Sequence, residues 1–108
     1  MSDEYDDDVD DTLPPVPEGG LIKLIPIINR RGLHARASAK FVQTVERYDA
    51  IVTVTRSGET VGGRSIMGLL TLGAAQGTAI AVVASGTDAE ACLTAIVDLL
   101  ANKFGEDE

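Results

Sequence analysis

The chain has 108 residues, of which 44% are hydrophobic, with two Tyr, two Phe and no Trp; this size fits one small domain. Seventeen Asp and Glu against nine Lys and Arg give a formal net charge of -8, but the acids are concentrated at the two ends. Residues 1–20 contain eight acids and no base, whereas residues 21–105 contain six acids and nine bases. A mildly basic domain therefore has acidic ends.

This composition excludes several classes of protein and site. A single Cys, Cys92, rules out an intramolecular disulfide, and one Cys with one His cannot form the thiolate–imidazole ligand set of a structural zinc site. Few bases and few stacking aromatic side chains argue against a nucleic-acid partner. The apolar runs are too short to cross a membrane, and the acidic N-terminus is unlike a signal peptide. We therefore expect a cytoplasmic protein without membrane insertion, bound metal or cofactor.

The N-terminal residues 1–20 combine the acidic run with three prolines and a Gly-Gly pair. High charge with little apolar surface to bury predicts a disordered tail with a Pro/Gly hinge. Residues 21–105 form the predicted domain, and the acidic residues 106–108 are predicted to be a short C-terminal tail.

The domain opens with a predicted strand over residues 21–28, in which Ile25 and Ile27 share one face. Pro26 lacks an amide proton and cannot donate to a neighbouring strand on both sides, so this strand is predicted to lie at a sheet edge. A polar turn follows at residues 29–32.

Helical spacing of apolar side chains then runs from about His34 to Tyr48. The β-branched residues 51–55 predict a second strand, and residues 59–62 predict a short returning strand. Residues 57–58, Ser-Gly, form the turn of this hairpin.

Three further elements complete the chain. Ser65 is predicted to begin a short helix that stops at Gly73, and residues 78–84 predict a buried strand. Thr87 or Asp88 caps a longer final helix. Its apolar face consists of Ala89, Cys92, Leu93, Ile96, Val97, Leu100 and Phe104.

The predicted order βαββαβα mixes strands and helices and contains a hairpin, which indicates an α+β fold. We expect a four-stranded, mainly antiparallel sheet with its helices packed on one face. Such a two-layer domain has no deep cleft for a small substrate, so its shape favours docking and transfer between proteins.

His34 is the candidate reactive residue. Gly32 permits a tight turn before it, and His34 then falls at a helix N-terminus, where backbone amides lack partners and the helix dipole is positive. This environment favours the neutral, nucleophilic ring, and it would stabilise a phosphoryl group together with Arg36, with Lys40 and the Arg30-Arg31 pair extending the positive field.

The residues alone also fit a surface histidine that does no more than cap its helix. A hydrolytic role is weaker still, because no acid lies beside His34 in sequence to orient the ring, although the fold could bring one through space.

Two motifs resemble those of the HPr family, the histidine-containing phosphocarriers of the bacterial phosphoenolpyruvate phosphotransferase system. The first is Ile-Ile-Asn-Arg-Arg-Gly-Leu-His-Ala-Arg and the second is Arg-Ser-Ile-Met-Gly-Leu-Leu-Thr-Leu-Gly, about thirty residues later. The similarity extends from Leu21 to Phe104. It implies an open-faced β-sandwich with sheet order 1-4-2-3, in which the first strand lies at an edge, as Pro26 also indicates.

The resemblance implies that His34 carries the phosphoryl group on Nδ1 and that Arg36 assists its transfer. Enzyme I would be the donor and an enzyme IIA domain the acceptor, so the protein would be a carrier and not an enzyme with its own turnover. One residue departs from the family pattern, because Ala37 stands where most members have Pro. Ala preserves the helix, and the departure puts in doubt the rigidity of the first turn, and with it the rate of transfer.

Ser65 has two compatible roles. Ser is a common N-cap, and a phosphate at a helix N-terminus would also be stabilised. The resemblance makes Ser65 the regulatory site that HPr kinase/phosphorylase modifies in many members of the family.

The docking surface is predicted to be apolar, with basic residues beside it that steer partners. It consists of Met67 and Leu70, with Arg36, Lys40 and Arg64 supplying charge. We expect a monomer that docks enzyme I, enzyme IIA and the kinase in turn.

Two alternatives remain open from the sequence. The carrier could serve a regulatory branch, such as a nitrogen-related or incomplete phosphotransferase system without sugar transport, for which Ala37 and the acidic tail leave room. Alternatively, the chain could be a regulatory module that only docks, although the presence of both His34 and Arg36 argues against this.

Overall fold

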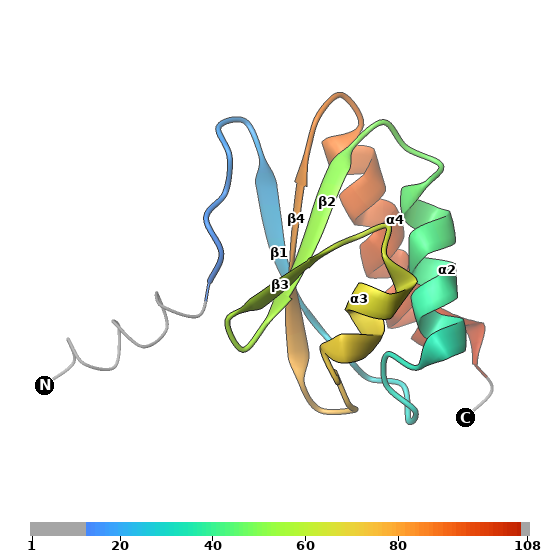
Figure 1. The fold of residues 1–108 in the computed structure, drawn as a ribbon. Helices are drawn as coiled ribbons and strands as arrows, with labels where there is room; N and C mark the ends of the chain where they lie inside the picture. Colours follow the sequence, from blue (N-terminus) through green and yellow to red (C-terminus); the bar gives the residue numbers. More distant parts are fainter. Residues whose placement is uncertain (1–12, 107–108) are drawn as a thin grey trace, which may run out of the picture.

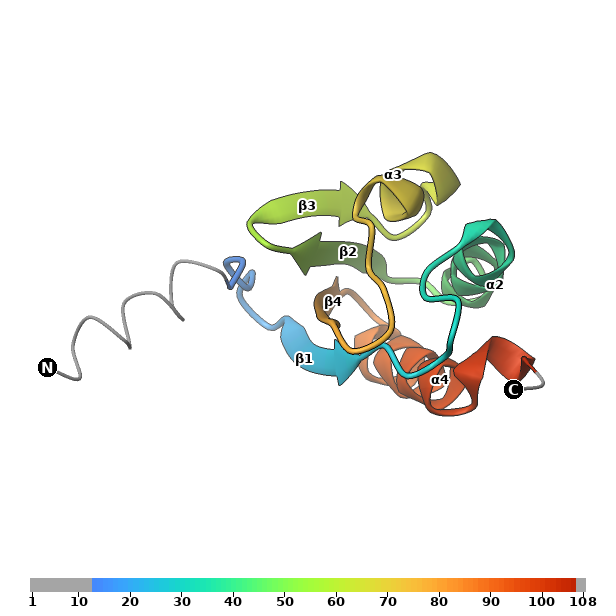
Figure 2. The ribbon, with the colours of Figure 1, turned by 90° about the horizontal axis from the view of Figure 1, so that it is seen from below.

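The computed structural model describes residues 13–106 and shows a sheet covered on one face by helices (Figure 1). The strands of the sheet are ordered β1-β4-β2-β3, every neighbouring pair is antiparallel, and α2, α3 and α4 lie on one side of it (Figure 2). The predicted α+β class, element order and sheet order are confirmed. The elements are β1 Leu21–Pro26, α2 Ala35–Val45, β2 Ile51–Arg56, β3 Glu59–Gly62, α3 Ile66–Thr71, β4 Ala79–Ser85, α4 Ala89–Ala101 and the 3-10 turn η1 Lys103–Gly105.

β1 is an edge strand, as the missing amide proton of Pro26 predicted. Pro26 pairs with Ala79, and the strand ends there, two residues earlier than predicted. Ile27 nevertheless keeps one bond to the sheet, because its amide donates to the Thr78 carbonyl at 2.8 Å. Ile25 and Ile27 are both buried, which confirms their predicted shared face.

The core lies between the inner face of the sheet and the three helices. Each large side chain buried there contributes about 1.5–3 kcal/mol to folding. The largest apolar ones are Ile27 just after β1, Phe41 and Val45 of α2, Val54 of β2, Leu69 of α3, Ile80 and Val82 of β4, Ile96 and Leu100 of α4, and Phe104. Since all three helices contribute to one core, the relative positions of their ends are held by the same packing.

The last helix ends earlier than its apolar spacing predicted. α4 stops at Ala101. The chain then reverses through three residues with positive φ, which are Lys103 at +56°, Phe104 at +57° and Gly105 at +74°. Phe104 is still buried, but it reaches the core from this left-handed turn and not from a helix face. The prediction of a helical position for Phe104 was wrong. Its spacing of four residues from Leu100 is typical of a helix, but an apolar side chain at this position can also reach the core from a turn.

The N-cap of α4 is Asp88, one of the two predicted caps, but the Asp88 side chain makes no capping hydrogen bond to the helix. Its Oδ2 accepts the Asp49 amide at 2.8 Å and thereby ties the start of α4 to the loop after α2.

The outer face of the sheet is partly covered by the segment that precedes β1, which lies on the side away from the helices (Figure 1). A shallow hollow on this face is lined by Pro14, Pro15, Pro17, Ile51, Thr53, Thr60, Val83 and Ser85. Most of the acidic run falls in residues 1–12, outside the described residues, so the predicted disorder of residues 1–20 stays a prediction.

Two loops are bonded along their lengths at the end of the sheet where β1 ends. The Gly77 amide donates to the Ile27 carbonyl at 2.9 Å, and the Leu33 amide donates to the Ala74 carbonyl at 2.9 Å. Gly32 lies between these bonds with φ +68°, and a Cβ at this position would be 2.5 Å from the Ala74 carbonyl oxygen. Both the backbone conformation and the available space therefore require glycine at position 32.

The two requirements at Gly32 can be separated experimentally. Gly58 also has a positive φ, +81°, but a Cβ there would meet no atom within 4 Å. We expect Gly58→Ala to lower the free energy of unfolding by about 1 kcal/mol and Gly32→Ala by about 3 kcal/mol or more, because only the second adds a steric overlap. Urea unfolding of both variants measures this difference, and equal losses would contradict the proposed overlap.

Cys92 is fully buried on the inner face of α4. Burial raises the pKa of the Cys92 thiol, while the positive charge of Arg64 opposes the rise and the negative charge of Asp88 adds to it. The reactive thiolate is therefore both scarce and inaccessible.

We expect the native protein to react with a disulfide reagent at neutral pH about a hundredfold more slowly than the urea-unfolded protein. Spectrophotometric thiol titration in the two states measures the ratio. Similar rates would mean that α4 opens readily in the native state.

Candidate functional site

The His34 ring occupies the N-cap of α2. Its backbone is extended, with φ -77° and ψ -176°, and the ring Nδ1 accepts a hydrogen bond from the Arg36 amide at 3.3 Å. Because Nδ1 accepts, it holds a lone pair, and in the neutral ring the proton is on Nε2. The N-cap geometry thus favours the Nε2–H tautomer and turns the Nδ1 lone pair toward the amides of the first helical turn.

The surroundings of Nδ1 favour negative charge. The first amides of α2 have no carbonyl partner within the helix, and the helix dipole adds a partial positive charge. The α2 helix has no acidic residue in its first turn. Arg36 is exposed, and within residues 13–106 its guanidinium makes no hydrogen bond or ion pair, so it can reach a group bound on His34.

An acid reaches His34 from the far end of the chain. A carboxylate oxygen of Glu106, Oε2, hydrogen-bonds to Nε2 of His34, 72 residues away in sequence. The other oxygen, Oε1, accepts from Nδ2 of Asn29 at 3.1 Å. Asn29 is fully buried and also donates to the Gly32 carbonyl at 2.8 Å, so it links the loop before α2 to the C-terminal segment.

Sequence reasoning missed Glu106 as a member of the site. It noted that no acid lies beside His34, and residues 106–108 were interpreted as a short acidic tail. A helix continued through Phe104 would not have returned the chain to α2; the left-handed turn at residues 103–105 does. No spacing in the sequence signals that turn, although Gly105 just before the acid is consistent with it.

Lys40 lies one turn beyond Arg36 on α2, and its Nζ donates to the Phe104 carbonyl at 2.6 Å. It therefore fastens the reversed C-terminal segment beside the helix. The loop before α2, the start of α2 and this segment come together at one end of the domain (Figure 1).

Ser65 is the N-cap of α3, as predicted. Its Oγ accepts the Gly68 amide at 2.9 Å, and the residue is exposed. A modifying enzyme would find the hydroxyl at the surface.

The predicted docking residues comprise two apolar residues of α3 and a set of basic residues. On α3, Met67 is 70% exposed and Leu70 is half-buried, while Leu69 between them is buried in the core. α3 packs beside α2, so the exposed side chains of α3 belong to the same layer as His34.

Arg64 is placed differently from the other basic residues. Its guanidinium donates to the carbonyls of Ala50 at 2.9 Å, Tyr48 at 3.1 Å and Val45 at 3.5 Å. Val45 is the last residue of α2 and the other two lie in the loop before β2, at the end of α2 opposite to His34. Arg64 therefore stabilises that helix end and the following loop as well as adding charge to the surface.

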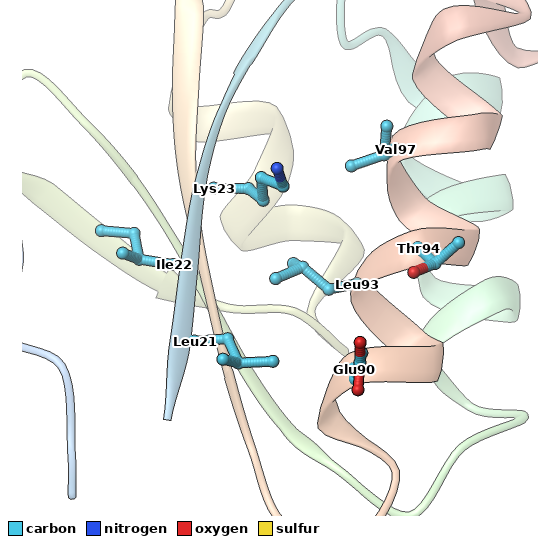
Figure 3. A pocket seen from close by; sticks show the side chains of 7 residues that line it. All are labelled: Leu21, Ile22, Lys23, Glu90, Leu93, Thr94 and Val97. Carbon is cyan, nitrogen blue, oxygen red and sulfur yellow. The ribbon is translucent and has the colours of Figure 1, made fainter. Parts of the chain in front are cut away.

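None of four hollows on the described surface is lined by His34 or Arg36, although Lys40 contributes to one of them. Another lies between β1 and α4, where Leu21, Leu93 and Val97 form an apolar floor with Lys23 and Glu90 at the rim (Figure 3). Within residues 13–106 no group of three His, Cys, Asp or Glu side chains could hold a metal ion, and no helix has the length and apolar character needed to cross a membrane. The His34 side chain is part-buried, with 16% of its surface exposed, and the exposed Arg36 lies two residues beyond it.

Comparison with known proteins gives a consistent result. The sequence model of a family described as "PTS HPr component phosphorylation site" matches residues 23–102. The chain is 48% identical over 84 residues to the phosphocarrier protein HPr of Neisseria meningitidis, covering 78% of this chain and 94% of that protein. It is 45% identical over 85 residues to the HPr of Pseudomonas aeruginosa, with the same two coverages.

Solved structures support the same assignment. The crystal structure of HPr-C-His from Thermoanaerobacter tengcongensis is similar with a TM-score of 0.78 at 40% identity, over 82% of this chain and 99% of that one. With the fold, the sheet order and the sequence similarity in agreement, the chain belongs to the HPr family of phosphocarrier proteins of the phosphotransferase system.

Proposed function

We propose that the protein accepts a phosphoryl group from phosphorylated enzyme I on Nδ1 of His34 and passes it to an enzyme IIA domain. The observation that carries this proposal is the hydrogen bond from the Arg36 amide to Nδ1, which aims the lone pair of the ring at a helix N-terminus. The proposed transfer takes place in the cytoplasm.

The same amide can serve both states of the carrier. In the free protein it donates to Nδ1. Once Nδ1 is bonded to phosphorus, its lone pair is used, and the Arg36 amide can turn its hydrogen bond to a phosphoryl oxygen. The exposed Arg36 guanidinium is then the second donor, since charge-assisted bonds to a phosphoryl group are strong and well oriented.

The proposed docking surface lies on α3 and α2. Met67 and Leu70 would supply apolar contact, and Lys40 and Arg64 would add positive charge that steers an acidic partner surface. Because both partners must reach His34, donor and acceptor would use this surface in turn.

The proposed phosphorylation of His34 can be tested directly. After incubation with enzyme I, phosphoenolpyruvate and magnesium, intact mass should show one acid-labile phosphoryl group. His34→Asn should take up none, and it should remain folded because Asn is a good N-cap.

Uptake of a labile phosphoryl group by His34→Asn would overturn the assignment. If the parent protein remains unmodified while enzyme I from the same source phosphorylates another carrier, the docking-only alternative holds. If the parent is phosphorylated, its transfer of the group to sugar-type or to regulatory enzyme IIA partners distinguishes a sugar pathway from a regulatory branch.

Ser65 is the proposed site of regulatory phosphorylation by an HPr kinase/phosphorylase. A phosphate on Ser65 would lie beside the exposed Met67 on the proposed docking surface and would repel an incoming phosphorylated partner. The exposed Ser65 hydroxyl and its position before α3 support this proposal.

We expect Ser65→Asp to slow phosphoryl transfer from enzyme I by about tenfold, with a smaller effect at high salt. Ser65→Asn is the matched control, because it keeps an N-cap side chain without the charge. Rapid-quench kinetics of both variants measure the effect, and equal rates would refute the electrostatic explanation.

A further inference from the structure

We propose that Glu106 is a positioning residue that keeps the proton on Nε2 of His34 and balances the positive charge that the ring gains when Nδ1 is phosphorylated. This inference rests on the proposed function and assigns a role to a residue outside both sequence motifs.

The carboxylate of Glu106 is held by two different donors. Oε2 contacts Nε2 of His34 and Oε1 accepts from Nδ2 of Asn29. Asn29 is itself fixed, because it is fully buried and donates to the Gly32 carbonyl. The carboxylate therefore has a defined orientation toward the ring, unlike a solvated acid in a free tail.

The backbone that delivers Glu106 is in an uncommon conformation. Lys103 and Phe104 both have positive φ, which is unfavourable for residues with a Cβ. Burial of the Phe104 ring and the bond from Lys40 to the Phe104 carbonyl offset this strain. The chain is thus folded back toward the histidine by specific packing.

The phosphoryl group and the phosphorylated His34 ring carry opposite charges, and Glu106 is placed to stabilise the charge of the ring. The helix N-terminus stabilises a phosphoryl dianion on Nδ1, but it disfavours positive charge on the ring. A carboxylate at Nε2, on the opposite side of the ring from Nδ1, stabilises that charge without approaching the phosphoryl group. Glu106 and the helix N-terminus therefore act on different atoms of one ring.

The charge of the His34 ring changes during phosphoryl transfer. The Nδ1 lone pair forms the bond to phosphorus, the bond between phosphorus and the donor atom of enzyme I breaks, and its electron pair stays with the donor. The His34 ring then carries a positive charge with its proton still on Nε2, beside Glu106. In the onward step an acceptor atom of the enzyme IIA domain bonds to phosphorus, the N–P electron pair returns to Nδ1, and the ring leaves as neutral imidazole with its proton still on Nε2.

The test compares Glu106→Gln with Glu59→Gln. The first keeps the size of the side chain, removes its charge and replaces one of its two acceptor oxygens by an amide donor. The second removes the same charge from β3, at the sheet edge opposite β1. We expect Glu106→Gln to lower the kcat of phosphoryl uptake from enzyme I by about tenfold to a hundredfold, with little change in KM for the carrier, and Glu59→Gln to leave both unchanged.

A second measurement does not depend on enzyme I. ¹⁵N chemical shifts of the His34 ring at a pH where it is neutral should show almost only the Nε2–H tautomer in the parent and a mixed population in Glu106→Gln. Urea unfolding of both proteins establishes that the variant is folded, so that a changed tautomer reports on Glu106 and not on stability.

The outcomes separate this inference from the proposed function. If the parent is phosphorylated on His34 and Glu106→Gln matches it in kcat and in ring tautomer, the role of Glu106 is refuted while the carrier function stands. If the parent takes up no phosphoryl group, the proposed function fails. A shifted tautomer with reduced kcat supports the role of Glu106.

Discussion

The N-cap position of the His34 ring is the constraint on which the site depends. A side chain in this position must turn back toward the first helical amides, so the ring presents Nδ1 to them. The same geometry leaves Nε2 facing away from the helix, toward the C-terminal segment. One local backbone conformation therefore determines which nitrogen is nucleophilic and which one needs a partner.

The rest of the fold holds this geometry in place from three directions. α2 is anchored by Phe41 and Val45 in the core, so its first turn cannot shift along the sheet. The loop before it is bonded to the loop after α3 through Leu33 and Ala74. The C-terminal turn is held by Lys40. These contacts hold the geometry of a ring that is only partly buried, which suits the proposed transfer between two proteins.

Local patterns predicted most of the fold and the helix side of the site. Pro26 indicated the edge strand, and the alternation of apolar residues located the strands, because both signals depend on neighbours in sequence. Gly32 and the helix periodicity placed His34 at a helix N-terminus and made it a candidate, and the two motifs that resemble the HPr family assigned its role. Glu106 was not found, because its approach depends on the positive φ values of Lys103 and Phe104, which neither residue type favours. Burial of the Phe104 ring selects that conformation, and such long-range packing leaves no local signature.

The pairing of the loop at residues 27–33 with the loop at residues 73–78 also restricts how such a chain can vary in length. Two hydrogen bonds join them, from the Gly77 amide to the Ile27 carbonyl and from the Leu33 amide to the Ala74 carbonyl. A residue inserted between the bonded positions of either loop would displace one of these bonds and the close approach of Gly32 to Ala74. A Cβ on Gly58, in the hairpin turn, would meet no atom within 4 Å. Insertions and deletions should therefore be tolerated better at the hairpin turn than in the two paired loops.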